Sequence, residues 1–120
     1  MGKILIVEDV DLNLDLLIQL LEDDFVVVSA RDGDAGVQMA TSETPDLILM
    51  DMSLPVMDGW EATRRIKSSA QTRSIPVIGL SAHAMNGDRE RAIASGCDDY
   101  LTKPVDEDLL FGKITAMLED

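Results

Sequence analysis

The sequence predicts an α/β domain in which helices cover both faces of a five-stranded parallel sheet. Short, continuous apolar runs recur along the chain, and longer segments with helical periodicity separate them. Continuous apolar runs are typical of strands that are covered on both faces. Strict alternation of strand and helix indicates βαβ units with right-handed crossovers, which produce a parallel sheet.

The predicted strands share a high content of branched aliphatic residues. We place them at residues 4–7, 25–28, 47–50, 77–80 and, with a weaker pattern, 100–101. In sheets of this class ligands gather at the carboxyl ends of the strands. The residues that follow each run are therefore the candidates for a functional site.

The first and last helices are indicated by apolar residues that recur three and four positions apart. The first is predicted over residues 11–22 and the last near the C-terminus. The residues that carry this pattern are Leu14, Leu17, Ile18 and Leu21 in the first helix and Leu110, Ile114, Met117 and Leu118 in the last.

Two further helices are indicated by the signals at their ends. Asp58 followed by Glu61 resembles a capping box that opens the third helix. The fourth helix is expected to begin near Ala84 and to stop at Gly96. It would also contain Gly87, which costs about 1 kcal/mol in a helix, so we expect it to be the least stable of the set.

Composition excludes several classes of protein. The chain has 120 residues and a formal net charge of −13, and its hydrophobic fraction of 46% is enough for one core. A surface with this much negative charge repels phosphate backbones and anionic lipids. We therefore expect neither nucleic acid nor membrane as a partner. The single cysteine, Cys97, is expected to be a small buried residue. Because no signal peptide precedes the first strand, we expect a soluble, cytoplasmic protein.

Polar residues follow the apolar runs. Glu8 and Asp9 follow the first, Asp51 the third, Ser81 the fourth and Lys103 the fifth. Clustered carboxylates raise each other's pKa unless a cation is present, and a hard divalent ion such as Mg²⁺ prefers oxygen ligands. We therefore expect a Mg²⁺ site at this edge of the sheet.

The same residues suit phosphoryl chemistry. The ammonium of Lys103 and the hydroxyl of Ser81 can contact phosphoryl oxygens, and a carboxylate beside Mg²⁺ can accept a phosphoryl group. We assign the acceptor role to Asp51. Taken singly, Asp9 would be a helix cap and Lys103 a solvated surface charge. The coincidence that all of them follow strands favours the functional interpretation.

Four segments together resemble the receiver domain of two-component response regulators. They are Glu8-Asp9, residues 47–59 (LILMDMSLPVMDG), residues 80–82 (LSA) and residues 100–104 (YLTKP). The resemblance covers nearly the whole chain, in order and at the family's spacing. It implies a flavodoxin-like (βα)5 fold, which is a doubly wound sheet with strand order 2-1-3-4-5. It also implies one receiver domain over residues 1–120, with no output domain.

The resemblance implies a role for each site residue. Asp51 would be phosphorylated by a histidine kinase or a histidine phosphotransfer protein. Lys103 would contact the phosphoryl group and form a cis peptide with Pro104. Ser81 and Tyr100 would be the paired switch residues. The ligands of Mg²⁺ would be Glu8, Asp9, Asp51 and the backbone carbonyl of Ser53.

The resemblance also implies how the signal leaves. The face for a downstream protein would be formed by the fourth helix, fifth strand and fifth helix. The chain would be a monomer or weak dimer. It would be a signalling receiver and not an enzyme, apart from its own phosphorylation and slow dephosphorylation. In motif style it is similar to receivers of hybrid histidine kinases and to single-domain receivers of cell-cycle phosphorelays, although Val10 stands where that subgroup often carries asparagine. His83 and Ser53 would flank the site and tune the lifetime of the aspartyl phosphate.

Three other interpretations remain. A haloacid-dehalogenase-type phosphohydrolase also uses an aspartate, a hydroxyl, a lysine and Mg²⁺, but it needs a second aspartate where this chain has Ser53. A pseudo-receiver would bind partners without phosphorylation, which the complete set of site residues argues against. The chain could also be a receiver excised from a hybrid histidine kinase.

Overall fold

A computed structural model describes residues 2–81 and 87–118, in which five strands alternate with five helices. The strands are β1 (Lys3–Val7), β2 (Val26–Ala30), β3 (Leu47–Asp51), β4 (Val77–Ser81) and β5 (Asp99–Thr102). The helices are α1 (Asp11–Leu21), α2 (Gly33–Glu43), α3 (Gly59–Ser68), α4 (Asp88–Ala94) and α5 (Glu107–Leu118).

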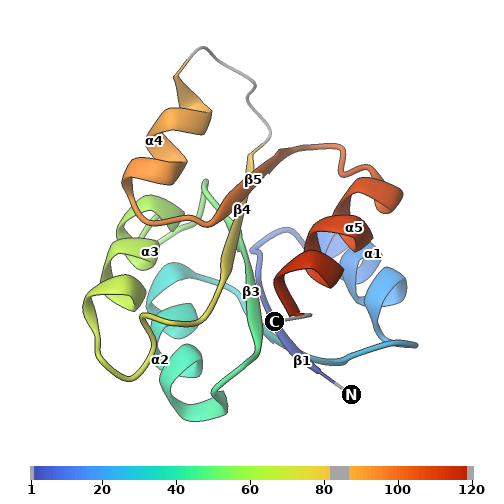
Figure 1. The fold of residues 1–120 in the computed structure, drawn as a ribbon, viewed down its shortest axis with the longest axis horizontal. Helices are drawn as coiled ribbons and strands as arrows, with labels where there is room; N and C mark the ends of the chain where they lie inside the picture. Colours follow the sequence, from blue (N-terminus) through green and yellow to red (C-terminus); the bar gives the residue numbers. More distant parts are fainter. Residues whose placement is uncertain (1, 82–86, 119–120) are drawn as a thin grey trace.

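The strands form one parallel sheet in the order β2-β1-β3-β4-β5. As Figure 1 shows, α1 and α5 cover one face of the sheet, while α2, α3 and α4 cover the other. The α/β class, the flavodoxin-like topology and the strand order are thus confirmed. The strand order places the ends of β1 and β3 side by side, with β4 and β5 next to them.

Two apolar cores lie on the two faces of the sheet. Successive residues of β1 point to opposite sides, so Ile4 and Ile6 pack with α1 and α5, whereas Leu5 and Val7 pack with the other helices. All four of these side chains are fully buried. The continuous apolar runs therefore have the physical origin expected from the sequence, because each strand contacts helices on both faces.

The start of α3 agrees with the sequence in one half of its cap. The side chain of Asp58 accepts a hydrogen bond of 2.9 Å from the backbone N–H of Glu61. The carboxylate of Glu61 forms ion pairs with Arg64 and Arg65 instead of completing a capping box. These pairs lower the pKa of Glu61, with the Arg65 hydrogen bond as the largest cause.

The fourth helix differs from the expectation at its start. Gly87 lies before α4 as its N-cap, in the left-handed region at φ 92°, so the predicted cost of a glycine inside the helix does not arise. The expected start near Ala84 lies outside the described residues. The end is as predicted: Gly96 has φ 111° and donates to Ile93, while Cys97 donates to Ala92, which is a Schellman motif.

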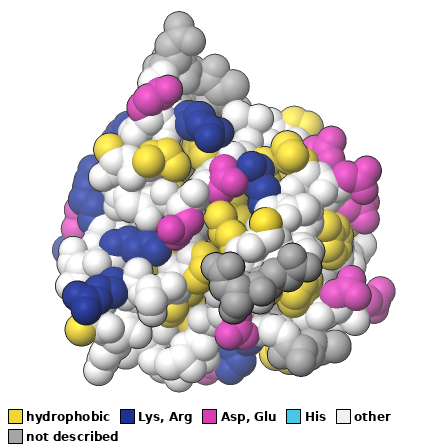
Figure 2. All heavy atoms as spheres, viewed as in Figure 1, with side chains coloured by type: hydrophobic (Ala, Val, Ile, Leu, Met, Phe, Trp, Pro, Cys, Tyr) yellow, Lys and Arg dark blue, Asp and Glu magenta, His cyan; other side chains and the backbone are white. Residues whose placement is uncertain are grey.

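Charge is unevenly distributed over the surface. On the face seen in Figure 2, basic side chains lie mainly on the side of α3 and α4, and acidic ones mainly on the opposite side. None of the helices in the described ranges has the length and apolar character that crossing a bilayer requires. Six of the ten basic residues fall between positions 64 and 91: Arg64, Arg65, Lys67, Arg73, Arg89 and Arg91.

Candidate functional site

Three carboxylates meet where β1 and β3 end. Glu8 and Asp9 follow β1, and Asp51 is the last residue of β3, which pairs with β1. One oxygen from each carboxylate lies within 4.8 Å of the other two. Glu8 and Asp51 are buried, whereas Asp9 is more open to solvent. The predicted acidic cluster is therefore present, and its oxygens suit a hard divalent cation.

Lys103 brings a positive charge to this cluster. Its Nζ lies 2.7 Å from Oε1 of Glu8 and 3.4 Å from Oδ2 of Asp51. Its backbone N–H donates to the carbonyl of Ser81 at 2.7 Å, which fixes the chain just after β5. The peptide bond between Lys103 and Pro104 is cis. One ammonium thus serves two carboxylates that come from different strands.

Burial and pairing change the acidities of this site in opposite ways. Burial raises the pKa of Glu8, and the nearby carboxyl of Asp51 raises it further, while the hydrogen bond from Lys103 opposes both. Burial alone would lower the pKa of Lys103, but Glu8 and Asp51 outweigh it and the pKa is raised. The site therefore has more negative charge than one lysine compensates, and a bound cation relieves this excess.

Backbone groups orient the two buried carboxylates. The N–H of Ser53 donates to Oδ1 of Asp51 at 3.1 Å, and the N–H of Val10 donates to Oε2 of Glu8 at 3.2 Å. Ser53 itself is exposed at the start of the segment between β3 and α3. Gly59 closes this segment tightly, because a Cβ at that position would lie 2.2 Å from the carbonyl oxygen of Asp51. A side chain there would displace the strand end that carries Asp51.

The remaining predicted residues lie on β4 and β5. Ser81 is buried at the end of β4, next to Thr102 in register. Tyr100 is only 7% exposed, and it packs in the core beneath α3 and α4. His83 lies outside the described residues. The structure thus brings together Glu8, Asp9, Asp51 and Lys103. Tyr100 lies within β5, before the segment that carries Lys103. Cys97 is buried, as predicted.

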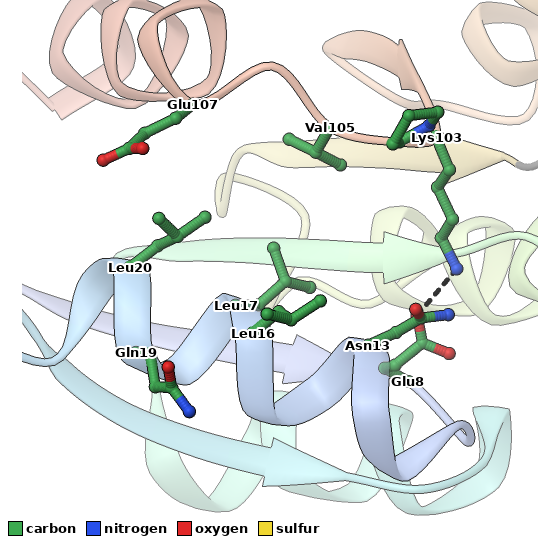
Figure 3. A pocket seen from close by; sticks show the side chains of 10 residues that line it. Glu8, Asn13, Leu16, Leu17, Gln19, Leu20, Lys103, Val105 and Glu107 are labelled. Carbon is green, nitrogen blue, oxygen red and sulfur yellow. Dashed lines mark hydrogen bonds and ion pairs between the residues drawn. The ribbon is translucent and has the colours of Figure 1, made fainter.

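A groove that was not anticipated from the sequence runs from this site between α1 and the segment after β5. It has a volume of about 520 Å³. Figure 3 shows Leu16 and Leu20 of α1 facing Val105, with the Lys103–Glu8 pair at one end. Leu16 is 51% exposed and lies outside the buried stripe of α1. In the sequence, a leucine outside the apolar stripe of this helix is the signal that indicates a second apolar surface.

Comparison with known proteins settles the family. The model of the response regulator receiver domain matches residues 4–115. The chain belongs to the response regulator receiver family. Receiver domains are phosphorylation switches of two-component systems rather than enzymes in the ordinary sense, and the family uses a divalent metal. Receivers interact with histidine kinases or phosphotransfer proteins and with downstream targets. Membership excludes the phosphohydrolase alternative.

The relatives differ in how a receiver is built into a protein. The chain is 39% identical over 117 residues to the response regulator PleD of Caulobacter vibrioides, covering 97% of this chain but only 26% of PleD. It is 38% identical over 119 residues to the polar-differentiation response regulator DivK of Brucella anthropi, covering 98% of this chain and 97% of DivK.

Solved structures show the same fold. The receiver domain of the sensor histidine kinase PA1611 of Pseudomonas aeruginosa has a TM-score of 0.92 and 36% identity, with 99% of this receiver and 98% of that chain covered. That structure has a magnesium ion coordinated in its active site cleft. The chemotaxis protein CheY4 of Vibrio cholerae has a TM-score of 0.90 and 25% identity, covering 98% of this receiver and 99% of that chain.

Proposed function

We propose that this receiver accepts a phosphoryl group on Asp51 and that Mg²⁺ is held by Glu8, Asp9, Asp51 and the carbonyl of Ser53. The observation that carries the proposal is the convergence of three carboxylates and one lysine: oxygens of Glu8, Asp9 and Asp51 lie within 4.8 Å of one another, and Nζ of Lys103 lies within 3.4 Å of two of these carboxylates. Hydrogen-bonded, oriented carboxylates with an excess of negative charge fit a divalent cation. When bound, the ion lowers the repulsion between Asp51 and an incoming phosphoryl group.

The chain's own residues would support the transfer as follows. A carboxylate oxygen of Asp51 forms a bond to phosphorus while the phosphorus–nitrogen bond of a donor phosphohistidine breaks. The second ring nitrogen of that histidine takes a proton from solvent, so the electron pair of the broken bond stays on a neutral imidazole. The N–H of Ser53 holds one oxygen of Asp51 in place. Lys103, already between Glu8 and Asp51, can pair with the oxygens of the transferred group.

Switching would follow from the new charge. In this proposal the hydroxyl of Ser81 donates to the phosphoryl group, and the ring of Tyr100 is held inward. Ser53 and His83 would flank the group and set its lifetime. Outside this self-modification we propose no catalysis, and we treat residues 1–120 as one receiver domain.

Two surfaces would serve two protein partners. The phosphodonor would pack on the apolar groove beside α1, because that groove ends at Lys103 and Glu8 and so leads to Asp51. The downstream target would contact α4, β5 and α5, where Tyr100 lies. In this arrangement donor and target contact different elements apart from α5, whose first residue, Glu107, also lines the groove. The domain itself is a monomer or weak dimer.

The proposal is tested with acetyl phosphate and Mg²⁺ followed by intact mass measurement. We expect the parent protein to gain one phosphoryl group and Asp51→Asn to gain none. Asp15→Asn, on the exposed surface of α1, is the matched control and should react as the parent does. A gain that survives Asp51→Asn, or no gain in the parent, would overturn the proposal.

A further inference from the structure

Val56 has a backbone conformation that valine rarely adopts. Its φ is 68°, in the left-handed region, where a branched side chain crowds its own backbone. The N–H of Met57 donates to the carbonyl of Pro55 at 2.7 Å, so Val56 is the central residue of a three-residue turn. Such a turn with a positive φ at its centre is rare and strained. Glycine would adopt this conformation without the steric cost.

This valine adds no packing to the fold. Its side chain is 84% exposed, more than any other large apolar side chain in the part of the chain that the structure describes. Pro55 beside it is also exposed, whereas Leu54 lies in the core. We call Pro55 and Val56 the apolar tip. Val56 therefore weakens the fold through its backbone, and residues that do so without a gain inside the protein occur mainly at functional sites.

The neighbours of the turn hold it in this conformation. A Cβ on Gly33 would lie 1.9 Å from the carbonyl oxygen of Met57, so this carbonyl is fitted closely against the start of α2. The N–H of Gly59 donates to the carbonyl of Met52 at 3.1 Å, which fixes the two ends of the segment to each other. The apolar tip is therefore presented at a fixed place, and a side chain that is already positioned loses little conformational freedom on binding.

The apolar tip lies at the edge of the sheet where Asp51 is placed. It belongs to the segment that joins β3, whose last residue is Asp51, to α3. Asp51 is only 3% exposed, so a donor histidine reaches it only between the segments that follow the strands. The groove beside α1 lies on one face of the sheet, and the tip leads into α3 on the other face (Figure 1). A donor protein that extends from the groove across Asp51 therefore meets the tip.

We propose that the apolar tip is a second docking contact for the phosphodonor and that Val56 is a specificity-determining residue. In the docked complex an apolar side chain of the donor protein packs on Val56 while the phosphohistidine faces Asp51. The inference rests on the proposed function, in which that histidine supplies the phosphoryl group. The segment 52–57 contains no charged residue, although the chain has 23 acidic ones. A donor with an apolar residue opposite Val56 gains buried apolar area, whereas a donor with a charge there must desolvate it without a partner.

The test compares two rates of Asp51 labelling for each variant. One donor is acetyl phosphate, which carries no protein surface. The other is a histidine phosphotransfer domain, phosphorylated on its histidine and taken from a purified panel as the one that labels the parent fastest. In Val56→Gly the ratio of the protein-donor rate to the acetyl phosphate rate should fall about tenfold or more, the effect of losing one buried valine side chain. The thermal midpoint should rise, because glycine removes the strain.

Thr44→Gly is the matched control. Thr44 is exposed, has a φ of 43° and ends α2 at the opposite edge of the sheet, just before β3 begins. Its replacement relieves the same kind of backbone strain far from Asp51, so the midpoint should rise and the ratio of the two rates should match the parent. Val56→Ile keeps a branched apolar side chain at the tip and should also keep the parent ratio.

The outcomes separate the docking contact from the proposed function. An unchanged ratio in Val56→Gly, or an equal fall in Thr44→Gly, overturns the docking contact. A lower midpoint in Val56→Gly also overturns it, because the valine would then support the fold. The same holds if acetyl phosphate labels Asp51 and no phosphohistidine protein in the panel does. If acetyl phosphate itself fails to label Asp51, the proposed function is overturned, and the inference that rests on it falls with it.

Discussion

Lys103 Nζ lies 2.7 Å from Oε1 of Glu8, although the two residues are 95 positions apart in the chain. The side chain of Glu8 is fully buried, and that of Lys103 is 17% exposed. The pair therefore links the end of β1 to the end of β5 across the site. It also compensates part of the negative charge of the acidic cluster.

Removing the lysine should destabilise the protein in a pH-dependent way. Lys103→Met leaves Glu8 buried without its cation, and we expect a loss of about 3 kcal/mol in the free energy of unfolding at pH 7 without metal. The pKa of Glu8 is raised on folding, so the carboxyl is protonated and its penalty disappears as pH falls toward the ordinary range of glutamate. Urea denaturation at several pH values measures this.

Lys113→Met provides a matched comparison for the lysine. Lys113 pairs with Asp99 at 2.8 Å, but both side chains are more than a fifth exposed. We expect a loss of about 1 kcal/mol or less, because exposed pairs contribute little. Equal losses in the two variants would show that the Lys103–Glu8 pair has no special weight.

Mg²⁺ should stabilise the fold through the acidic cluster. At a metal concentration about one hundred times the Kd, we expect the parent to gain about 2.7 kcal/mol in the free energy of unfolding. Asp9→Asn removes one carboxylate of the cluster and should lose most of this gain, whereas Asp15→Asn should keep it. Titration of the denaturation midpoint with MgCl₂ measures the effect, and the same gain in both variants would exclude Asp9 as a ligand.

Val10 offers a direct test of how α1 begins. It is the N-cap of α1 in an extended conformation, and its side chain forms no capping hydrogen bond. Val10→Asn supplies an acceptor for the first turn and should stabilise the protein by about 1 kcal/mol, while Val10→Ala should not. Thermal unfolding of the three proteins decides this, and an unchanged midpoint in Val10→Asn would mean that the new side chain does not cap the helix.

The groove beside α1 predicts a separation between two phosphodonors. Leu16→Glu places a charge on the apolar wall of the groove without touching the acidic cluster. We expect transfer from a phosphohistidine protein to slow about tenfold or more, the effect of losing about 1.4 kcal/mol of binding, while labelling by acetyl phosphate stays at the parent rate. Leu109→Glu, an exposed leucine on α5 outside the groove lining, is the control. Equal slowing with both donors would contradict docking in the groove.

The strands could be predicted from sequence because burial on both faces leaves a continuous apolar run. The ends of the strands were harder to predict. β3 and β4 end at Asp51 and Ser81, and these polar residues do not continue the apolar runs from which the strands were predicted. The helix α2 has no apolar stripe to reveal it, because its buried positions are Gly33, Gly36 and Ala40. Gly33 is required by close approach, since a Cβ there would lie 1.9 Å from the carbonyl oxygen of Met57.

The site could be predicted where residue chemistry marks it and not where only shape does. Carboxylates after strands pointed to the acidic cluster, and the ammonium of Lys103 after the fifth apolar run pointed to a contact with phosphoryl oxygens. The direct pair between Lys103 and Glu8 was not foreseen, because it depends on side-chain distances across the sheet. The groove beside Leu16 is likewise a property of packing, and such a space leaves no polar residue in the sequence to indicate it.

Chemical trapping tests most directly whether Asp51 accepts the phosphoryl group. Protein treated with acetyl phosphate and Mg²⁺ is reduced with borohydride, which converts an aspartyl phosphate into homoserine, and the peptides are mapped by mass. We expect homoserine at position 51, only in the treated sample and only when Mg²⁺ is present. Homoserine at another aspartate, or none at position 51 while the intact protein carries phosphate, would contradict it.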